Sequence, residues 1–522
     1  MAGAELPVAI IGAGPIGLTT ALGLAFHRIP FVVFEDDERL SLDTKAGTTL
    51  TRTLEVFERY GVADAVLAQA VRVDEIGEID RATNRSTLSV RLDALDAETR
   101  YPFVINLPQD RMEPVLAAAL AGSPYGKVQL GHRLTRYENR GDHVHLWLDT
   151  PDGAREIDAR YLLACDGGRS TVREQMGVTV EGKSFPERYV LVDLEADLDI
   201  ANPRDYPYLA YFGDPTEWMI LVRQPHCWRF LFPLADGHAE PTADELRDKV
   251  LQFIGDVKDV RVLGMNVYRV HHRVASRWRD ERVFLMGDAA HLITPMWALG
   301  LNTGVLDASN LPWRLAWVLR GWAPESLLDG YEREQKPLAV DGSRLMAEAA
   351  RENMARRAER VTAMTDNNWG NAYTRSLLGV RMDVNGSGAG GMVKTATEPP
   401  IEVGDRMPNV RLHDAHGREC RLHDLTRDRF AALYLTDARR KPPLPASDSR
   451  GLAHYIVSRW DAPHDSGQRD RALLDPGGRF AKRLGVPPDS IVLVRPDEHV
   501  AAIAPMTADA ALRLYHKAIG KP

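Results

Sequence analysis

A glycine-rich turn near the beginning of the chain has the residue types and the spacing that dinucleotide binding requires. Gly12, Gly14 and Gly17 form a GxGxxG pattern that also contains Pro15. In such a turn the first glycine allows a tight bend, the second lets the backbone approach a pyrophosphate, and the third lets a helix pack closely on a strand. Glu35 follows at roughly the 20-residue distance where an acid accepts hydrogen bonds from a ribose diol. The pattern predicts a dinucleotide site, and a purely structural glycine turn is the alternative.

The segments around this turn have the composition of a strand, a helix and a second strand. Residues 8–11 are a continuous apolar run, which is typical of a strand buried on both faces. Residues 18–26 predict a helix of mostly small and apolar residues, and residues 31–34 predict a second strand that ends before Glu35. The free N–H groups and the positive dipole at the start of such a helix favour an anion. This arrangement does not decide between NAD and FAD.

Two later motifs repeat the order of an apolar strand, an acid and a helix or loop. Asp166 follows the apolar residues 161–164, and Asp288 follows the largely apolar residues 283–287. The second motif continues as Ala-Ala-His, where a structural role for His291 is favoured over a catalytic one, and then reaches a Gly-Leu-Asn-Thr-Gly turn. Helix caps at strand ends are the alternative for both aspartates. In this order the three motifs resemble those of the group A flavoprotein aromatic hydroxylases, the family of p-hydroxybenzoate hydroxylase and phenol hydroxylase.

The resemblance implies a tightly bound FAD and assigns individual residues to it. Asp288 is expected to hydrogen-bond a ribitol hydroxyl. Pro295 and the backbone of residues 299–302 are expected to lie along the isoalloxazine. Backbone N–H groups suit this position, because a reduced flavin carries negative charge near its N1 and O2 atoms.

Other family positions can be carried over one at a time. Lys45 and Arg52 stand where the family has two arginines, although a lysine lacks the bidentate fork. Gln109 stands at the place of a flavin-contacting glutamine, Asp166 matches an acid that contacts FAD and pyridine nucleotide, and Arg173 matches a flanking basic position. Solvated surface charge is the alternative for the basic residues. The motif and the resemblance together give the following expected cofactor residues: Gly12, Gly14, Pro15, Gly17, Glu35, Lys45, Arg52, Gln109, Asp166, Asp288, Pro295, Gly300, Leu301 and Asn302.

The middle of the chain has the composition of a β-sheet. Four segments, centred on residues 189–192, 208–212, 218–222 and 228–232, are rich in aromatic and β-branched residues. The family places a substrate-covering antiparallel sheet here, and walls with few polar groups suit an aromatic ring. The expected substrate-pocket residues, each with simple packing or surface exposure as its alternative, are Tyr211, Arg223, His226, Arg229 and Trp297.

These observations predict an α/β fold with three parts. Residues 1–180 are expected to form the first part of a Rossmann-like FAD-binding domain of the GR2 type, and residues 181–275 an inserted antiparallel β-sheet domain that binds substrate. Residues 276–365 are expected to complete the FAD-binding domain and add long closing helices, and residues 366–400 to form a flexible linker. Residues 401–522 resemble the thioredoxin-like tail of the phenol and 3-(3-hydroxyphenyl)propionate hydroxylase branch. This tail has no C-x-x-C pair, which excludes disulfide exchange.

Composition excludes several other classes of function. The 522 residues include 65 Lys and Arg against 73 Asp and Glu, a net charge of −8, which argues against a nucleic-acid binder. The three cysteines form no C-x-x-C pair, so neither a disulfide framework nor a thiolate zinc site is expected, and no metal is predicted. No long apolar run and no signal sequence are evident, so we expect a cytoplasmic protein without membrane contact. A homodimer is expected from the family alone.

The reaction that the resemblance implies is an FAD-dependent monooxygenation of a phenolic or related small aromatic substrate. NADPH or NADH would be a transient co-substrate with O₂, and oxygen transfer would proceed through a C4a-hydroperoxyflavin. Two alternatives stay open: a Baeyer–Villiger or epoxidising flavin monooxygenase acting on a polyketide-like substrate, and a redox-silent flavoprotein.

Overall fold

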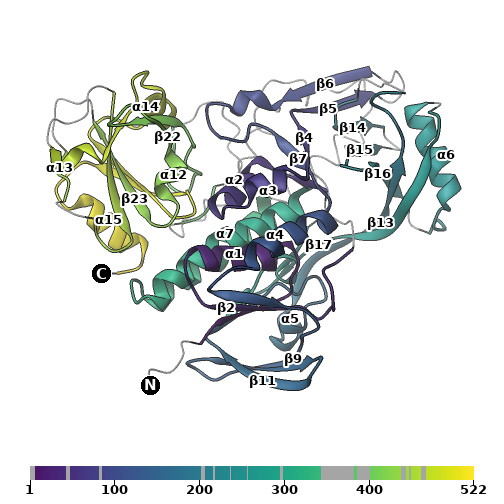
Figure 1. The fold of residues 1–522 in the computed structure, drawn as a ribbon, viewed down its shortest axis with the longest axis horizontal. Coiled ribbons are helices and arrows are strands. Elements are labelled where there is room, and N and C mark those ends of the chain that lie inside the picture. The colour runs from purple at the N-terminus through teal and green to yellow at the C-terminus, as the bar shows by residue number, and fades with distance from the viewer. Residues whose placement is uncertain are drawn as a thin grey trace.

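A computed structural model describes most of the chain, and it has three parts (Figure 1). A largely parallel sheet with its helices lies at the centre and bottom of the view, a second sheet lies at the upper right, and the C-terminal unit lies at the left. The described residues are 6–42, 47–80, 85–201, 206–214, 218–235, 237–255, 257–293, 298–342, 381–384, 400–436, 442–445, 448–459 and 466–521.

The first sheet carries the glycine-rich turn. Its six strands run in the order β18-β19-β12-β1-β2-β8, and β1 pairs in parallel with both β2 and β12. The continuous apolar runs form its central strands because both faces are covered. The strands are β1 (Val8–Ile11), β2 (Phe31–Phe34), β8 (Gly126–Gln129), β12 (Tyr161–Ala164), β18 (Arg279–Asp280) and β19 (Val283–Leu285). The two predicted strands at residues 8–11 and 31–34 are confirmed.

Helices cover this sheet and connect it to the other parts. Helix α1 is buried on nearly all sides, because α7 and α4 pack against it. The helices of this part are α1 (Pro15–Phe26), α2 (Thr51–Arg59), α3 (Ala63–Leu67), α4 (Gln109–Leu120), α5 (Thr171–Gln175) and α7 (Leu299–Leu319). Two small sheets complete it, with strands β3 (Thr48–Thr49), β4 (Val71–Val73) and β7 (Val104–Asn106), and β9 (Arg133–Asn139), β10 (Val144–Thr150) and β11 (Gly153–Ala159).

The second sheet has eight strands in the order β20-β17-β13-β16-β15-β14-β5-β6. Helix α6 (Ala243–Ile254) packs its apolar side against one face. The strands are β5 (Glu75–Asp80), β6 (Arg85–Arg91), β13 (Val180–Glu195), β14 (Leu209–Gly213), β15 (Met219–Arg223), β16 (Trp228–Leu234), β17 (Arg261–Ala275) and β20 (His291–Leu292).

This sheet differs from the expected insertion in two respects. It recruits β5, β6 and β20 from outside residues 181–275, and β14 pairs with β5 in parallel, so the sheet is not wholly antiparallel. The predicted segments 189–192 and 228–232 fall within β13 and β16, and the segments 208–212 and 218–222 overlap β14 and β15 but begin one residue early. The long strand β17 was not singled out, because its charged and apolar residues do not alternate regularly.

The region after α7 is helical as far as it is described. The elements are η4 (Glu325–Leu328), α8 (Asp329–Pro337) and the π-helical turn η5 (Leu338–Gly342). The rest of the expected closing helices, and most of the expected linker, lie outside the described residues.

The C-terminal unit contains a seven-stranded sheet in the order β22-β21-β25-β24-β23-β26-β27. Strand β23 is parallel to β24 and antiparallel to β26. The elements are β21 (Arg411–Asp414), β22 (Glu419–Arg421), α12 (Leu422–Thr426), β23 (Phe430–Thr436), β24 (Leu452–Ser458), α13 (Ser466–Arg469), β25 (Ala472–Leu474), α14 (Arg479–Leu484), β26 (Ser490–Val494), β27 (Val500–Pro505) and α15 (Ala510–Ala518). Phe430 of this unit packs edge-on against Trp313 and Trp317 of α7, which joins the two parts through one apolar core.

The three cysteines are free. Among the described residues, no helix has the length and the apolar character needed to cross a membrane.

Candidate flavin and substrate site

The three sequence motifs meet around one cavity of about 540 Å³. Gly14 comes from the first turn, Gly168 from the second motif, Asp288 from the third, and Gly300 from the start of α7. They converge because β1, β12 and β19 are parallel neighbours, so their carboxyl ends lie at the same edge of the sheet.

Gly12 and Gly17 are required because a Cβ would clash there, and Gly14 is required because it leaves the backbone accessible. Gly12 has φ +100°, and a Cβ there would lie 2.4 Å from the carbonyl oxygen of Cys165. A Cβ on Gly17 would lie 1.9 Å from the carbonyl oxygen of Gly12. At Gly14 the nearest heavy atom to a Cβ is Oε1 of Glu113, at 4.0 Å, so this glycine leaves its backbone open to the cavity. The turn therefore fits a pyrophosphate at the start of α1.

Glu35 lies at the end of β2, beside the glycine-rich turn. Its Oε2 accepts a hydrogen bond from the Ala13 N–H at 2.5 Å, and its Oε1 accepts one from the Asp37 N–H at 3.3 Å. Burial raises the pKa of this carboxyl to about 7, with a further contribution from Asp36. The acid thus stands where a ribose-binding carboxylate is expected, and it changes protonation near neutral pH.

Asp166 is the acid of the second motif and follows the end of β12. Its Oδ2 accepts a hydrogen bond from the Val172 N–H at 3.2 Å, in the first turn of α5, while its Oδ1 is buried and without a hydrogen-bond partner among the described residues. Burial raises the pKa of this carboxyl above its ordinary value. The helix-cap alternative therefore accounts for one of its oxygens, and Asp166 itself is not among the residues that line the cavity. Arg173 joins the second and third motifs by donating to the carbonyls of Gly168 (2.6 Å) and Ala289 (3.0 Å).

The start of α7 faces the cavity through Gly300 and Leu301. The residue before the helix, Ala298, has φ +56°, a left-handed conformation that a residue with a Cβ rarely adopts. Asn302 holds this start in place: its Oδ1 accepts from the Leu50 N–H at 2.9 Å, and its Nδ2 donates to the Thr48 carbonyl at 3.1 Å. The first N–H groups of this long helix provide positive potential at this wall of the cavity.

The second sheet supplies the opposite wall of the cavity. Most of these lining residues are apolar: Leu191, Leu209, Ile220, Val222 and Leu231. Tyr211 also lines it and is buried, which raises the pKa of its phenol above the ordinary value, so its hydroxyl stays protonated at neutral pH. Arg229 lines it from β16.

Not every predicted residue reaches this cavity. Gln109 lines it and donates to Glu113 Oε1 at 2.7 Å. His226 is exposed in the turn between β15 and β16, and Arg223 pairs with Asp199 at 3.2 Å; neither lines the cavity. The predictions for Lys45, Pro295 and Trp297 lie outside the described residues. His291 is buried and bonded to Asp307 at 2.8 Å, as expected for a structural histidine.

Several lining residues were missed. Asn266, Tyr268, Arg269 and His271 all come from β17 and line the cavity. Their positions follow from the pairing of β17 with β13 over most of its length. The alternation of Asn266 and Tyr268 is the signal that could have indicated a strand facing a site.

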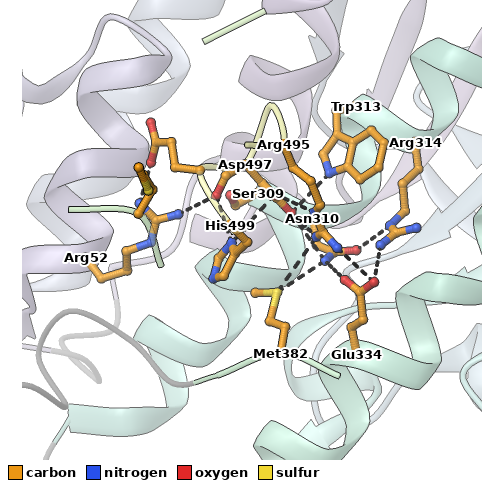
Figure 2. Close-up of polar contacts among 12 residues, drawn as sticks. Arg52, Ser309, Asn310, Trp313, Arg314, Glu334, Met382, Arg495, Asp497 and His499 are labelled. Atoms are coloured by element: carbon orange, nitrogen blue, oxygen red, sulfur yellow. Dashed lines mark hydrogen bonds and ion pairs between the residues drawn. The ribbon is translucent and has the colours of Figure 1, made fainter. Parts of the chain in front are cut away.

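Arg52 lies in a buried network between the first part and the C-terminal unit (Figure 2). It donates to Glu55 at 3.0 Å, to Glu498 at 2.5 Å and to the Asp497 carbonyl at 2.7 Å, and it is not among the residues that line the cavity. Its two terminal nitrogens are engaged by protein acceptors, so the structure places it in packing between parts rather than at the expected pyrophosphate position. The segment that precedes it, at Thr48, does line the cavity.

The same network continues along α7. Figure 2 shows Asp497 accepting from Trp313 (3.1 Å), while Glu334 accepts from Arg314 (2.6 Å) and Arg495 (2.9 Å). Nearby, the side chains of Glu55, His423 and Glu498 lie close enough together to share a metal ion. Arginines already pair with both of these carboxylates, so we assign no metal there.

Comparison with known proteins agrees with this site. Residues 5–344 match the family described as FAD binding domain. The chain is 30% identical over 515 residues to the 6-methylpretetramide 4-monooxygenase of Streptomyces rimosus, covering 95% of this chain and 90% of that protein. It is 34% identical over 344 residues to a 3-(3-hydroxy-phenyl)propionate/3-hydroxycinnamic acid hydroxylase of Mycobacterium sp. (strain JLS), covering 64% of this chain and 57% of that protein.

A solved structure is similar over the whole chain. The ternary complex of aklavinone-11 hydroxylase with FAD and aklavinone has a TM-score of 0.82 and 26% identity, with 100% of both chains covered. The predictions of an α/β flavoprotein, of FAD as cofactor and of an aromatic monooxygenase are confirmed. The chain belongs to the group A flavoprotein aromatic hydroxylases and is an FAD-dependent aromatic monooxygenase.

Proposed function

We propose that this monooxygenase hydroxylates a fused-ring phenol of the class that 6-methylpretetramide and aklavinone represent, with NADPH or NADH as reductant and O₂ as oxidant. The observation that carries the proposal is the single cavity that extends from the flavin motifs to the second sheet. A rigid, extended ring system would contact both sides of such a cavity.

The names of relatives that align over nearly the full chain support this substrate class. Two proteins that are similar over nearly the whole chain are named for 6-methylpretetramide and aklavinone. The hydroxylase named for a phenylpropionate matches over a shorter part of this chain. The apolar lining from β13, β14, β15 and β16 is consistent with a large ring system that carries few charges.

Bound FAD would supply the oxidation chemistry, namely acceptance of reducing equivalents from the nicotinamide and activation of O₂. The chain's own residues would bind and orient. The turn at Gly14 would hold the pyrophosphate, Glu35 the ribose, and the N–H groups at Gly300 the negative side of the flavin. Tyr211 and Arg229 would orient ring oxygens, and the aliphatic wall would exclude water from the reacting atoms.

Two structural assignments belong to the same proposal. The eight-stranded sheet would act as the substrate cover, since it contributes the far wall of the cavity. The C-terminal unit would be thioredoxin-like, since its central strands β24, β23 and β26 combine parallel and antiparallel pairing. Its buried ion pairs with α2 support a structural role.

The test uses the purified holoenzyme with a panel of fused-ring and single-ring phenols. We expect NADPH or NADH oxidation to accelerate with a fused-ring phenol and to yield a product heavier by one oxygen. Acceleration by single-ring phenols alone would reject the proposed substrate class. Conversion of a ring ketone to a lactone would support the Baeyer–Villiger alternative, and no acceleration by any aromatic would support a redox-silent flavoprotein.

A further inference from the structure

We propose that Arg229 and Gln224 form a specificity site that binds a carbonyl oxygen of the substrate and disfavours a carboxylate. The inference rests on the proposed function and deepens it by naming a substituent that the fused-ring substrate carries. It comes from three unpaired polar atoms that meet beside the cavity.

Arg229 has a donor group that the protein leaves unused. Arg229 on β16 stands directly opposite Asp193 on β13. Asp193 binds it in a bidentate pair, with Nε 2.8 Å from Oδ1 and Nη2 2.9 Å from Oδ2. This pair fixes the plane of the guanidinium. The remaining nitrogen, Nη1, is buried and has no hydrogen-bond partner among the described residues, and the side chain lines the cavity.

Gln224 brings two more unpaired atoms to the same place. Its side chain is fully buried, and neither Nε2 nor Oε1 has a hydrogen-bond partner in the part of the chain that the structure describes. A Cβ built on Gly47 would lie 2.5 Å from Gln224 Nε2 and 3.4 Å from Arg229 Nη1. Both donors therefore approach Gly47, a lining residue without a side chain. Arg229 lines the cavity, whereas Gln224 is fully buried next to the lining residue Gly47 and does not itself line it. Buried polar groups are normally paired, so two adjacent unpaired side chains beside a cavity indicate a ligand acceptor.

The charge balance selects the kind of acceptor. Asp193 already neutralises Arg229, and both side chains are buried. A carboxylate here would add an unpaired negative charge in a poorly solvated place, which is unfavourable. A carbonyl oxygen accepts hydrogen bonds from Nη1 and Nε2 without bringing a net charge. Arg269, the other arginine of the lining, is exposed, so it does not change this balance at Arg229.

The test compares two fused-ring phenols, one that carries carbonyl groups and one that carries none. The holoenzyme is titrated with 1-hydroxyanthraquinone and with 1-hydroxyanthracene, and binding is followed by the FAD absorbance. Gln224→Leu is expected to weaken 1-hydroxyanthraquinone binding about tenfold, which corresponds to about 1.4 kcal/mol, and to leave 1-hydroxyanthracene binding unchanged. The melting temperature should stay the same or rise, because unpaired buried polar atoms are replaced by an apolar group of similar size.

A second variant and a control complete the test. Arg229→Met combined with Asp193→Leu removes the pair without leaving a buried charge, and it should lose the same discrimination. Gln69→Leu, at an exposed position, should change neither ligand's affinity. If both ligands bind equally more weakly and the melting temperature falls, Arg229 and Gln224 serve only packing. If FAD affinity falls while the ratio of the two ligand affinities stays the same, the two residues serve the cofactor. Either result overturns the proposal.

Failure of the proposed substrate class is recognised separately. If the wild-type enzyme binds neither fused-ring ligand, that class is wrong. The same variants are then compared with 2-hydroxyacetophenone and 2-ethylphenol, which form a single-ring pair with and without a carbonyl. An unchanged preference between these two in Gln224→Leu would overturn the carbonyl site, and loss of the preference would support it.

Discussion

Arg52 and Glu498 stand 446 positions apart in the sequence and form a buried ion pair, with Nη1 2.5 Å from Oε2. Arg52 belongs to α2, which follows the cavity-lining residues Thr48 and Leu50. Glu498 belongs to the turn between β26 and β27 of the C-terminal unit and also pairs with Arg59 at 2.6 Å. The C-terminal unit is therefore anchored on the helix that begins beside the cavity.

This relationship predicts a large loss of stability in Glu498→Gln. The substitution would leave Arg52 and Arg59 buried without their shared carboxylate, which costs about 3–5 kcal/mol. Urea unfolding of the holoenzyme measures the loss. Glu240→Gln is the matched control, because Glu240 is 65% exposed in its pair with Arg188 and such pairs contribute at most about 1 kcal/mol. Equal unfolding free energies for the two variants would contradict the anchoring role.

Gly14→Ala should separate cofactor binding from folding. The backbone there, with φ −67° and ψ 179°, is open to alanine, and a Cβ would meet only Glu113 Oε1 within 4 Å. The new methyl group would occupy the space through which the backbone approaches a pyrophosphate. We expect the apoprotein to keep its melting temperature and FAD affinity to fall about tenfold or more, which is about 1.4 kcal/mol. Gly122→Ala, where a Cβ meets nothing within 4 Å, is the control. Unchanged FAD affinity in Gly14→Ala would place the pyrophosphate elsewhere.

The protonation of Glu35 predicts that apoprotein stability and FAD affinity change in opposite directions with pH. Burial raises its folded pKa from 4.5 to about 7, so the folded apoprotein gains protons relative to the unfolded chain between these values. Its contribution to apoprotein stability is therefore fully present below pH 4.5 and is lost as the pH rises through about 7. FAD affinity should change the other way and increase through pH 7, because only the carboxylate accepts both hydrogen bonds of a ribose diol.

Fluorescence titration of FAD between pH 6 and 8 measures this second dependence. In Glu35→Gln the affinity should be lower at high pH and independent of pH. A pH dependence that persists in this variant would show that another group titrates.

Asn302→Ala should loosen the start of α7. The change leaves the buried Leu50 N–H without its acceptor and removes the hydrogen bond to the Thr48 carbonyl. Each buried group left unpaired lowers the free energy of unfolding by about 1–3 kcal/mol. Asn302→Asp keeps the acceptor but places a buried carboxylate oxygen against the Thr48 and Ala298 carbonyls, so it should lose at least as much stability as the alanine variant. Thermal unfolding of both variants measures this order, and an aspartate variant clearly more stable than the alanine variant would contradict it.

The elements around the glycine-rich turn could be predicted from the sequence, because their signals are local. Continuous apolar runs give β1 and β2, and Gly12 and Gly17 between them stand where a Cβ would clash with backbone atoms. The same reasoning located Glu35, Asp166 and Asp288 at the ends of strands.

The rest of the site depends on contacts between distant segments. Arg52 was assigned to the cofactor because of its place in a motif, yet its partner Glu498 comes from a turn in another part of the chain. The β17 residues line the cavity because of the register of β17 with β13, and the alternation of Asn266 and Tyr268 alone does not specify that register. Gln224 carries no motif, and its significance arises only because its buried side chain has no hydrogen-bond partner among the described residues.

The most direct test of the central claim is the fate of molecular oxygen. The FAD-loaded enzyme is supplied with NADPH, ¹⁸O₂ and the fused-ring phenol that binds best, and the product is examined by mass spectrometry with fragmentation. We predict incorporation of one ¹⁸O atom as a hydroxyl group on an intact ring system. Reductant oxidation that gives only hydrogen peroxide, with no oxygen transferred to any aromatic in the panel, would contradict the account.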